Sequence, residues 1–459
     1  AQGKASLVLE QNVILKEGTN LGNALDYIQI NSKDLRVENG VNLSATNGIR
    51  SNAAGVGNLI FDGDSTVSGV VGSNVALNDV TIDSTNTAKT VDFLNKLNIA
   101  GDLTISKTDT AILRGEVVAN NIQGAGANQG TVKFYNSTEL TGATAVTAAI
   151  GNVALDTVVL GGKNITFNHA AGTFNTKTLA FDGKLNELTA TFSKLGANAL
   201  QNTTITTNSK IRGHNIVLND ADHTLDKAVG SAANNFGNFK LLTDKTVTVN
   251  HADFYAGVIS KTNQEGTVNF NANNGNVVQL GDATNELKAV TFNQNITAHG
   301  GVYSKTITVV ANKTAKFKEV VRSSGAMTIN TGSYILFDGA NARSAAVIAA
   351  NAAGDGTVEY NNTVAISAAV GAAGAQVNAI NFTGTAATQI ASVGANLTAN
   401  NIAIGAQTFK PTADIKLNGT TAINGSTLDF NSANLTLENS ATSIMTGNVT
   451  VNTTFAENA

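Results

Sequence analysis

Short segments in which apolar and polar residues alternate recur along the chain. Three of them share one pattern, Gly-Thr-Val followed by a polar and then an aromatic residue, at residues 130–134, 266–270 and 356–360. Because successive side chains of an extended strand point to opposite faces, the valine and the aromatic residue face the same side. The polar residue between them, Lys133, Asn269 or Glu359, then faces solvent. The pattern predicts short strands with one buried face.

A second apolar element follows these strands after about 20 residues. At this distance Phe270 is followed by Val290, and Tyr360 is followed by Ile380. The spacing matches one coil of a β-helix, in which three short strands and three turns complete one layer. The sequence therefore predicts an all-β, elongated solenoid, a parallel β-helix with coils of about 20 residues.

The whole chain, residues 1–459, is predicted to form a single continuous solenoid domain. No Pro-, Gly- or Ser-rich segment interrupts it in the manner of a linker. The distances between equivalent strands are unequal, which indicates a repeat with irregular insertions. The Ala-rich stretch 342–353 has the composition of a short helix or a long loop. We predict that residues 340–355 leave the coil as an excursion.

The composition favours strands and tight turns. Charged residues are only 14% of the chain, and Asn, Thr, Ser, Ala and Gly supply much of the remainder. There are 44 glycines but a single proline, and proline, unlike glycine, removes a donor from a β ladder. Asn side chains at repeated turns can stack as amide ladders from coil to coil. The absence of cysteine excludes disulfides and thiolate metal sites.

The densest cluster of potential metal ligands consists of Asn219, Asp220, Asp222, His223 and Asp226. Carboxylates and an imidazole could bind calcium or zinc. The alternative is a simple turn, since Asn and Asp side chains are typical of turns, and we favour the turn. We therefore predict no cofactor, with Asp220, Asp222, His223 and Asp226 as the only candidates for a metal site.

No catalytic motif is present in the sequence. The five histidines are isolated, and no metalloprotease, serine-hydrolase or phosphate-loop motif occurs.

The net charge of −4 and the lack of long runs of like charge argue against nucleic acid as a partner. No run of about 18 apolar residues occurs, so no transmembrane helix is expected. The most basic segment contains Lys313, Lys316, Lys318 and Arg322. We interpret it as a solvated strand face rather than a site for sulfated glycans or anionic lipids.

The Gly-Thr-Val-x-aromatic strands and the element NELKAVTF at residues 285–292 resemble the passenger regions of bacterial autotransporters. They are most similar to the rickettsial surface-cell-antigen and outer-membrane protein B type, over most of residues 50–455. This resemblance implies a right-handed β-helix that is exported through a C-terminal outer-membrane barrel and acts as an adhesin or a surface layer. No barrel follows the solenoid in this chain. We therefore expect a processed or truncated passenger, or retention at the surface by other means.

We predict a non-catalytic structural protein of the bacterial cell surface, extracellular and associated with the outer membrane. It would be an adhesin-type passenger or a surface-layer subunit that acts by display and self-association. Its predicted partners are further copies of itself, in an oligomer or surface lattice, and a host-cell receptor or glycan.

The rival hypothesis is a carbohydrate-active β-helix enzyme, a polysaccharide lyase or hydrolase, which requires carboxylates that converge on one face of the coils.

Overall fold

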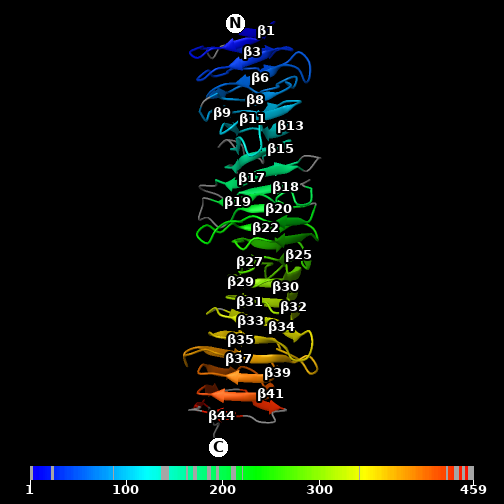
Figure 1. The fold of residues 1–459 in the computed structure, drawn as a ribbon, viewed down its shortest axis with the longest axis vertical. Coiled ribbons are helices and arrows are strands. Elements are labelled where there is room, and N and C mark those ends of the chain that lie inside the picture. Colours follow the sequence, from blue (N-terminus) through cyan, green and yellow to red (C-terminus); the bar gives the residue numbers. More distant parts are fainter. Residues whose placement is uncertain are drawn as a thin grey trace, which may run out of the picture. The chain divides into compact units, whose positions relative to one another are not determined.

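The computed structural model shows an all-β protein, and no helix occurs among the residues that it describes. Parallel strands stack layer upon layer as a β-solenoid of about 19 turns, which confirms the predicted fold class (Figure 1). The chain divides into two compact units, Ala1–Phe239 and Lys240–Ala459, which are described separately. The prediction of one continuous domain stays a prediction. The structure describes residues 4–21, 25–85, 87–135, 144–161, 164–168, 173–182, 188–192, 196–207, 213–219, 221–340, 342–430, 433–438, 444–446 and 450–452.

The first unit contains a small sheet and three longer parallel ladders. The small sheet consists of β1 (Ala5–Leu9), β3 (Leu25–Ile30) and β5 (Ile49–Arg50). The first ladder consists of β2 (Val13–Leu15), β4 (Asp34–Val37), β6 (Asn58–Phe61), β8 (Val80–Ile82), β11 (Asp102–Ile105), β13 (Val117–Gly124), β15 (Thr144–Leu160) and β17 (Phe174–Phe181). The second ladder consists of β7 (Ser65–Val67), β9 (Thr90–Phe93), β12 (Thr110–Leu113), β14 (Thr131–Phe134), β15, β17 and β19 (Thr204–Thr207). The third ladder consists of β10 (Leu97–Asn98), β13, β15, β16 (Ile165–Phe167), β18 (Thr189–Phe192) and β20 (Asn215–Leu218).

Three strands of the first unit, β13, β15 and β17, belong to more than one ladder. Each of them continues from one face of a coil to the next, so the coil bends at these points without a loop. β21 (His223–Leu225) lies near the end of this unit, and β22 (Asn238–Leu241) contains its boundary.

The second unit has the same plan. The fourth ladder consists of β23 (Thr246–Val249), β25 (Glu265–Phe270), β28 (Leu287–Phe292), β30 (Val302–Val309), β32 (Val320–Ile329) and β34 (Ala342–Ala350). The fifth ladder consists of β26 (Gly275–Val277), β29 (Ile296–Ala298), β31 (Thr314–Phe317), β33 (Tyr334–Phe337), β35 (Asp355–Tyr360), β37 (Val377–Phe382), β39 (Leu397–Ile404) and β41 (Ile415–Asn424), with which both β43 (Leu435–Glu438) and β44 (Ile444–Thr446) pair. The sixth ladder consists of β24 (Gly257–Ser260), β27 (Gln279–Leu280), β30, β32, β34, β36 (Val364–Ile366), β38 (Ile390–Val393), β40 (Thr408–Pro411), β42 (Thr427–Asp429) and β45 (Thr450–Asn452).

The predicted direction of the side chains is confirmed in all three Gly-Thr-Val-x-aromatic strands. In β14, β25 and β35 the valine and the aromatic residue are at most 1% exposed, whereas the polar residue between them is only half-buried. The coil length is less regular than the sequence suggests. Val268 pairs with Val290, 22 residues further on, so the equivalent of Phe270 is Phe292 and not Val290.

Paired residues are separated by as few as 17 residues, from Val290 to Ile307, and by as many as 29, from Val117 to Val146. The strands of each coil stay in register with those of the adjacent coils because they share ladder hydrogen bonds. The coils therefore differ in length mainly in the turns between their strands.

The prediction of an excursion near residues 340–355 is wrong. Most of this segment is the strand β34, which pairs in parallel with β32 on one side and with β36 on the other. Ser344, Ala346 and Ile348 alternate with more exposed residues and are at most 1% exposed. Alanine has the highest helix propensity, but here two neighbouring strands satisfy the backbone of an extended chain, and this tertiary context outweighs the local preference.

Aromatic side chains form a continuous buried stack in the second unit. Its members are all at most 1% exposed, and they are Phe254, Phe270, Phe292, Phe317, Phe337, Tyr360, Phe382 and Phe409. Consecutive ring centroids lie 5.0–6.0 Å apart, within the range of favourable aromatic pairs. Each coil therefore packs its largest side chain against that of the next coil, which ties the stability of neighbouring coils together.

Amide side chains stack at the surface, as the composition predicts. The Asn271 amide donates to the Oδ1 atom of Asn250 (3.0 Å), and the Asn293 amide donates to the Oδ1 atom of Asn271 (2.8 Å). In the first unit the Asn78 amide donates to Asn58 (3.0 Å), which donates in turn to Asp34 (2.8 Å). These bonds link polar side chains of successive coils, so these side chains satisfy one another outside the core.

Candidate functional site

The predicted metal candidates that the structure describes, Asp222, His223 and Asp226, lie around β21, and they do not all point to one side of it. His223 is 2% exposed and points into the interior, whereas Asp222 is exposed. The carboxylate of Asp226 accepts a hydrogen bond from the Gln201 amide (2.6 Å). Asp220 lies outside the described residues. Within the described part of the chain, no group of three or more His, Cys, Asp or Glu side chains could hold a metal ion.

The buried imidazole of His223 makes the fold sensitive to acid. Burial lowers the pKa of His223 to about 4, and the charge of Asp222 opposes part of this shift. The unfolded chain takes up this proton near pH 6.5, whereas the folded chain does so only near pH 4. The contribution of the neutral imidazole to stability is therefore complete above pH 6.5 and is lost as the pH falls to about 4. We expect this one residue to lower the free energy of unfolding by about 3 kcal/mol across that range.

The measurement is denaturant unfolding of the parent protein and of His223→Leu at neutral pH and near pH 4. The variant lacks the titrating group, so its stability should fall by about 3 kcal/mol less than that of the parent between neutral pH and pH 4. The same pH dependence in both proteins would show that His223 does not contribute.

The outward side of the fourth ladder contains a band without charged side chains, which we call the threonine face, and Glu265, Lys288 and Lys305 of the same strands border it. Its positions are half-buried or exposed, and they are Thr246, Thr248, Thr267, Asn269, Ala289, Thr291, Thr306, Thr308, Ala326, Thr328, Val347 and Ala349. Direct strand pairing places one row in register: Thr248, Asn269, Thr291, Thr308, Thr328 and Ala349. Neighbouring strands are about 4.8 Å apart and alternate residues about 6.7 Å apart. Hydroxyl and methyl groups therefore form a regular two-dimensional array.

Three hydroxyl groups in the middle of this array are unpaired among the described residues. The hydroxyl groups of Thr291, Thr308 and Thr328 have no hydrogen-bond partner among the described residues, whereas that of Thr306 donates to the carbonyl of Lys288 (3.2 Å). Val347 is 42% exposed, which is unusual for a large apolar side chain in this protein. The threonine face thus combines unpaired hydroxyls and exposed methyl groups on a rigid sheet.

The basic segment lies on and beside β31, and its charge is partly offset by nearby groups. Lys316 forms an ion pair with Asp338, and the ammonium of Lys313 donates to the side chain of Gln294 (2.9 Å). Arg322 lies 3.7 Å from the carboxylate of Glu286. This local pairing agrees with the interpretation of the segment as a strand face rather than an anion site.

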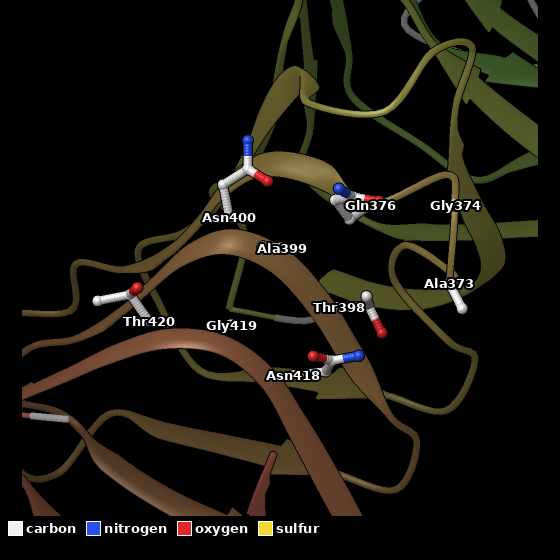
Figure 2. Close-up of a pocket in the computed structure, with 9 residues that line it drawn as sticks. All are labelled: Ala373, Gly374, Gln376, Thr398, Ala399, Asn400, Asn418, Gly419 and Thr420. Atoms are coloured by element: carbon white, nitrogen blue, oxygen red, sulfur yellow. The ribbon is translucent and has the colours of Figure 1, made fainter. Parts of the chain in front are cut away.

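A shallow hollow of about 380 Å³ lies beside β39 and β41, and we call it the amide hollow. It is lined by Ala373, Gly374, Gln376, Thr398, Ala399, Asn400, Asn418, Gly419 and Thr420. Figure 2 shows Gln376 and Asn400 along one side and Thr398 beside Asn418 on the other. None of the nine lining residues has a titratable side chain. The hollow can therefore offer amide and hydroxyl groups to a ligand but no charge.

An irregularity in the strand pairing shapes the amide hollow. Thr398 pairs with Asn418 and Asn401 with Thr420, so two residues of β39 oppose the single residue Gly419 of β41. Such a β-bulge bends the strand. The φ angle of Gly419 is +140°, and a Cβ atom at this position would lie only 1.9 Å from the carbonyl oxygen of Ala399. Only glycine permits this close approach of the two strands.

Sequence analysis missed both of these surfaces. The pairs Thr246 with Thr248 and Thr306 with Thr308 are visible as Thr-x-Thr patterns. Their alignment into rows depends on the register of coils of unequal length, which the sequence does not reveal. No common motif marks the three amide residues of the hollow, Gln376, Asn400 and Asn418. They line the same hollow only because successive coils stack.

Stacked parallel coils define the fold of this chain as a β-solenoid. Its relatives are rickettsial. The chain is 28% identical to "Outer membrane protein B" of Rickettsia typhi over 99% of its own length, 29% identical to that of Rickettsia conorii over 82%, and 28% identical to that of Rickettsia prowazekii over 97%. It spans 29%, 25% and 29% of the lengths of these relatives, respectively.

The resemblance predicted from the strand motifs is thereby confirmed, and so is the predicted location at the outer membrane and cell surface. No protein-family model matches the chain, and no solved structure matches it. In the described ranges, no helix has the length and apolar character needed to cross a bilayer.

Proposed function

We propose that this chain is a non-catalytic structural part of the bacterial surface, an adhesin-type passenger or a surface-layer subunit, which associates with further copies of itself through the threonine face. The observation that supports self-association is the lack of charge over the twelve outward positions of this band on six paired strands. The charges at its border are partly paired, Lys288 with Asp244 and Arg322 with Glu286.

A second copy is the partner that an uncharged face suits best. When a surface packs on itself, each residue meets the same kind of surface, and like charges would repel. Here the contact would bring together hydroxyl and methyl groups of similar size. The backbone of these strands is already paired within the solenoid, so side-chain packing and the unpaired hydroxyls would supply the contact.

A non-catalytic role is supported by the chemistry of the amide hollow and by the relatives. General acid–base catalysis needs a positioned titratable group, and glycoside hydrolysis needs two carboxyl groups. The lining of the hollow contains none. The relatives are named as outer membrane proteins and not as enzymes.

The test is analytical ultracentrifugation over a range of concentrations, with electron microscopy of the concentrated samples. The parent should form oligomers or a lattice. The double variant Thr291→Lys/Thr308→Lys places two like charges on paired residues in the middle of the threonine face, and we expect it to associate at least about tenfold more weakly, a difference of about 1.4 kcal/mol.

The matched control is Asn381→Lys/Ala403→Lys, which puts the same two charges on paired outward residues of the fifth ladder. It should associate as the parent does. A parent that stays a monodisperse monomer at high concentration, or a threonine-face variant that associates normally, would refute the proposal.

A further inference from the structure

We propose that the amide hollow is a binding site for a neutral sugar, held through the side-chain amides of Gln376 and Asn400. This goes beyond display and self-association, since it assigns a ligand class to a surface on the fifth ladder that lies apart from the threonine face. The inference rests on the chemistry of the lining, on the state of its amides and on the size of the hollow.

The lining matches the chemistry of sugar hydroxyl groups. A carboxamide presents a donor and an acceptor side by side, and a sugar hydroxyl also donates and accepts. A charged ligand would find no opposite charge in this lining. An apolar ligand would remove the amides from water without replacing their hydrogen bonds, at a cost of about 1–3 kcal/mol for each group. A neutral polyol avoids both costs.

The amides of this hollow differ from those elsewhere in the solenoid. Along the turn after the fourth ladder, the amide of Asn293 donates to Asn271 and that of Asn271 donates to Asn250, from coil to coil. The side chains of Gln376 and Asn400 come from successive coils too, yet neither has a hydrogen-bond partner among the described residues. Gln376 is half-buried, which makes an unpaired amide more costly there than at an open surface. These groups are therefore available to a ligand that displaces water.

Strand pairing positions Asn400, and Gln376 lies in the turn directly before β37. Asn400 belongs to the bulged part of β39, and the opposing Gly419 allows the two strands to approach closely. Ligand pockets usually have volumes of about 300–1,000 Å³, so a hollow of about 380 Å³ fits one or two sugar rings. No aromatic side chain lines it, so we expect a dissociation constant only on the order of 1 mM.

The test is saturation-transfer NMR followed by calorimetry, with glucose, galactose, mannose and N-acetylglucosamine as neutral probes. N-acetylneuraminic acid and glucosamine 6-sulfate serve as charged probes. Each probe is titrated to roughly ten times the expected dissociation constant. At least one neutral sugar should bind saturably to the parent protein. The double variant Gln376→Ala/Asn400→Ala removes two amides that have no hydrogen-bond partner in the described part of the chain, so it should fold as the parent does and bind that sugar at least tenfold more weakly.

Asn381→Ala is the matched control, because it removes an outward amide from the neighbouring strand β37 without touching the hollow, and it should bind sugar normally. Thr291→Lys/Thr308→Lys should also retain sugar binding, so failure of the self-association proposal leaves this result unaffected. The inference is overturned if no neutral sugar binds the parent, if only the charged probes bind, or if the double variant binds as tightly as the parent.

Discussion

Replacement of Val268 with aspartate is expected to lower the free energy of unfolding by about 4 kcal/mol or more. Val268 is fully buried in β25, between Val247 and Val290 of the adjacent coils. An aspartate here would place a carboxylate in an apolar interior with no partner, so it must either stay charged at a large cost or bind a proton. Because each coil is stabilised by its neighbours, the damage should extend beyond β25. Denaturant unfolding followed by far-ultraviolet circular dichroism measures the loss.

The adjacent substitution Asn269→Asp is the control. Asn269 faces outward and is half-buried, so the new carboxylate stays in contact with water and should change stability by less than about 0.5 kcal/mol. The comparison is made at low protein concentration, because Asn269 belongs to the threonine face. Equal losses in the two variants would mean that the direction of the side chains in β25 has been assigned wrongly.

Phe337→Ala is expected to cost about 3–5 kcal/mol. The ring of Phe337 is fully buried, and its centroid lies 5.6 Å from that of Phe317 and 5.0 Å from that of Tyr360. Its removal interrupts the aromatic stack and leaves a cavity that a hydrogen-bonded coil cannot easily close, since the positions of the strands are set by the ladders on both sides. Thermal and denaturant unfolding should both report the loss.

Tyr360→Phe distinguishes the loss of a ring from the loss of a polar group. Tyr360 is the one tyrosine of the stack, its hydroxyl is fully buried near Ser344, and burial raises the pKa of this hydroxyl. Phenylalanine keeps the ring, so stability should change by no more than about 1 kcal/mol. A loss as large as that of Phe337→Ala would show that the buried hydroxyl, and not ring packing, stabilises this part of the stack.

Local patterns were sufficient to predict strands and the side that each one buries. In Val132, Phe134 and their equivalents, alternation alone indicated the inward positions, because the period of two is a property of any extended backbone. The amide ladders also followed from composition. These features depend on a few consecutive residues, or on the mere repetition of coils, and not on how many residues separate one coil from the next.

Features that depend on register could not be predicted in the same way. The Ala-rich strand β34 was mistaken for an excursion, because alanine by itself favours a helix and the pairing with β32 and β36 is invisible in the sequence. The equivalence of Phe270 with Phe292 rather than Val290 has the same cause. Turns of unequal length shift the register from coil to coil, and only the ladder hydrogen bonds decide which residues meet.

The sequence by itself determined the fold class, the side of each motif strand that is buried, and the resemblance to rickettsial surface proteins, because all three depend on short motifs and local alternation. Only the tertiary structure decided that threonines of five strands align into one uncharged band, and that Gln376 and Asn400 border one hollow. These surfaces arise where residues of different coils become neighbours, and long-range hydrogen bonding between strands, rather than the order of residues along the chain, controls which residues those are.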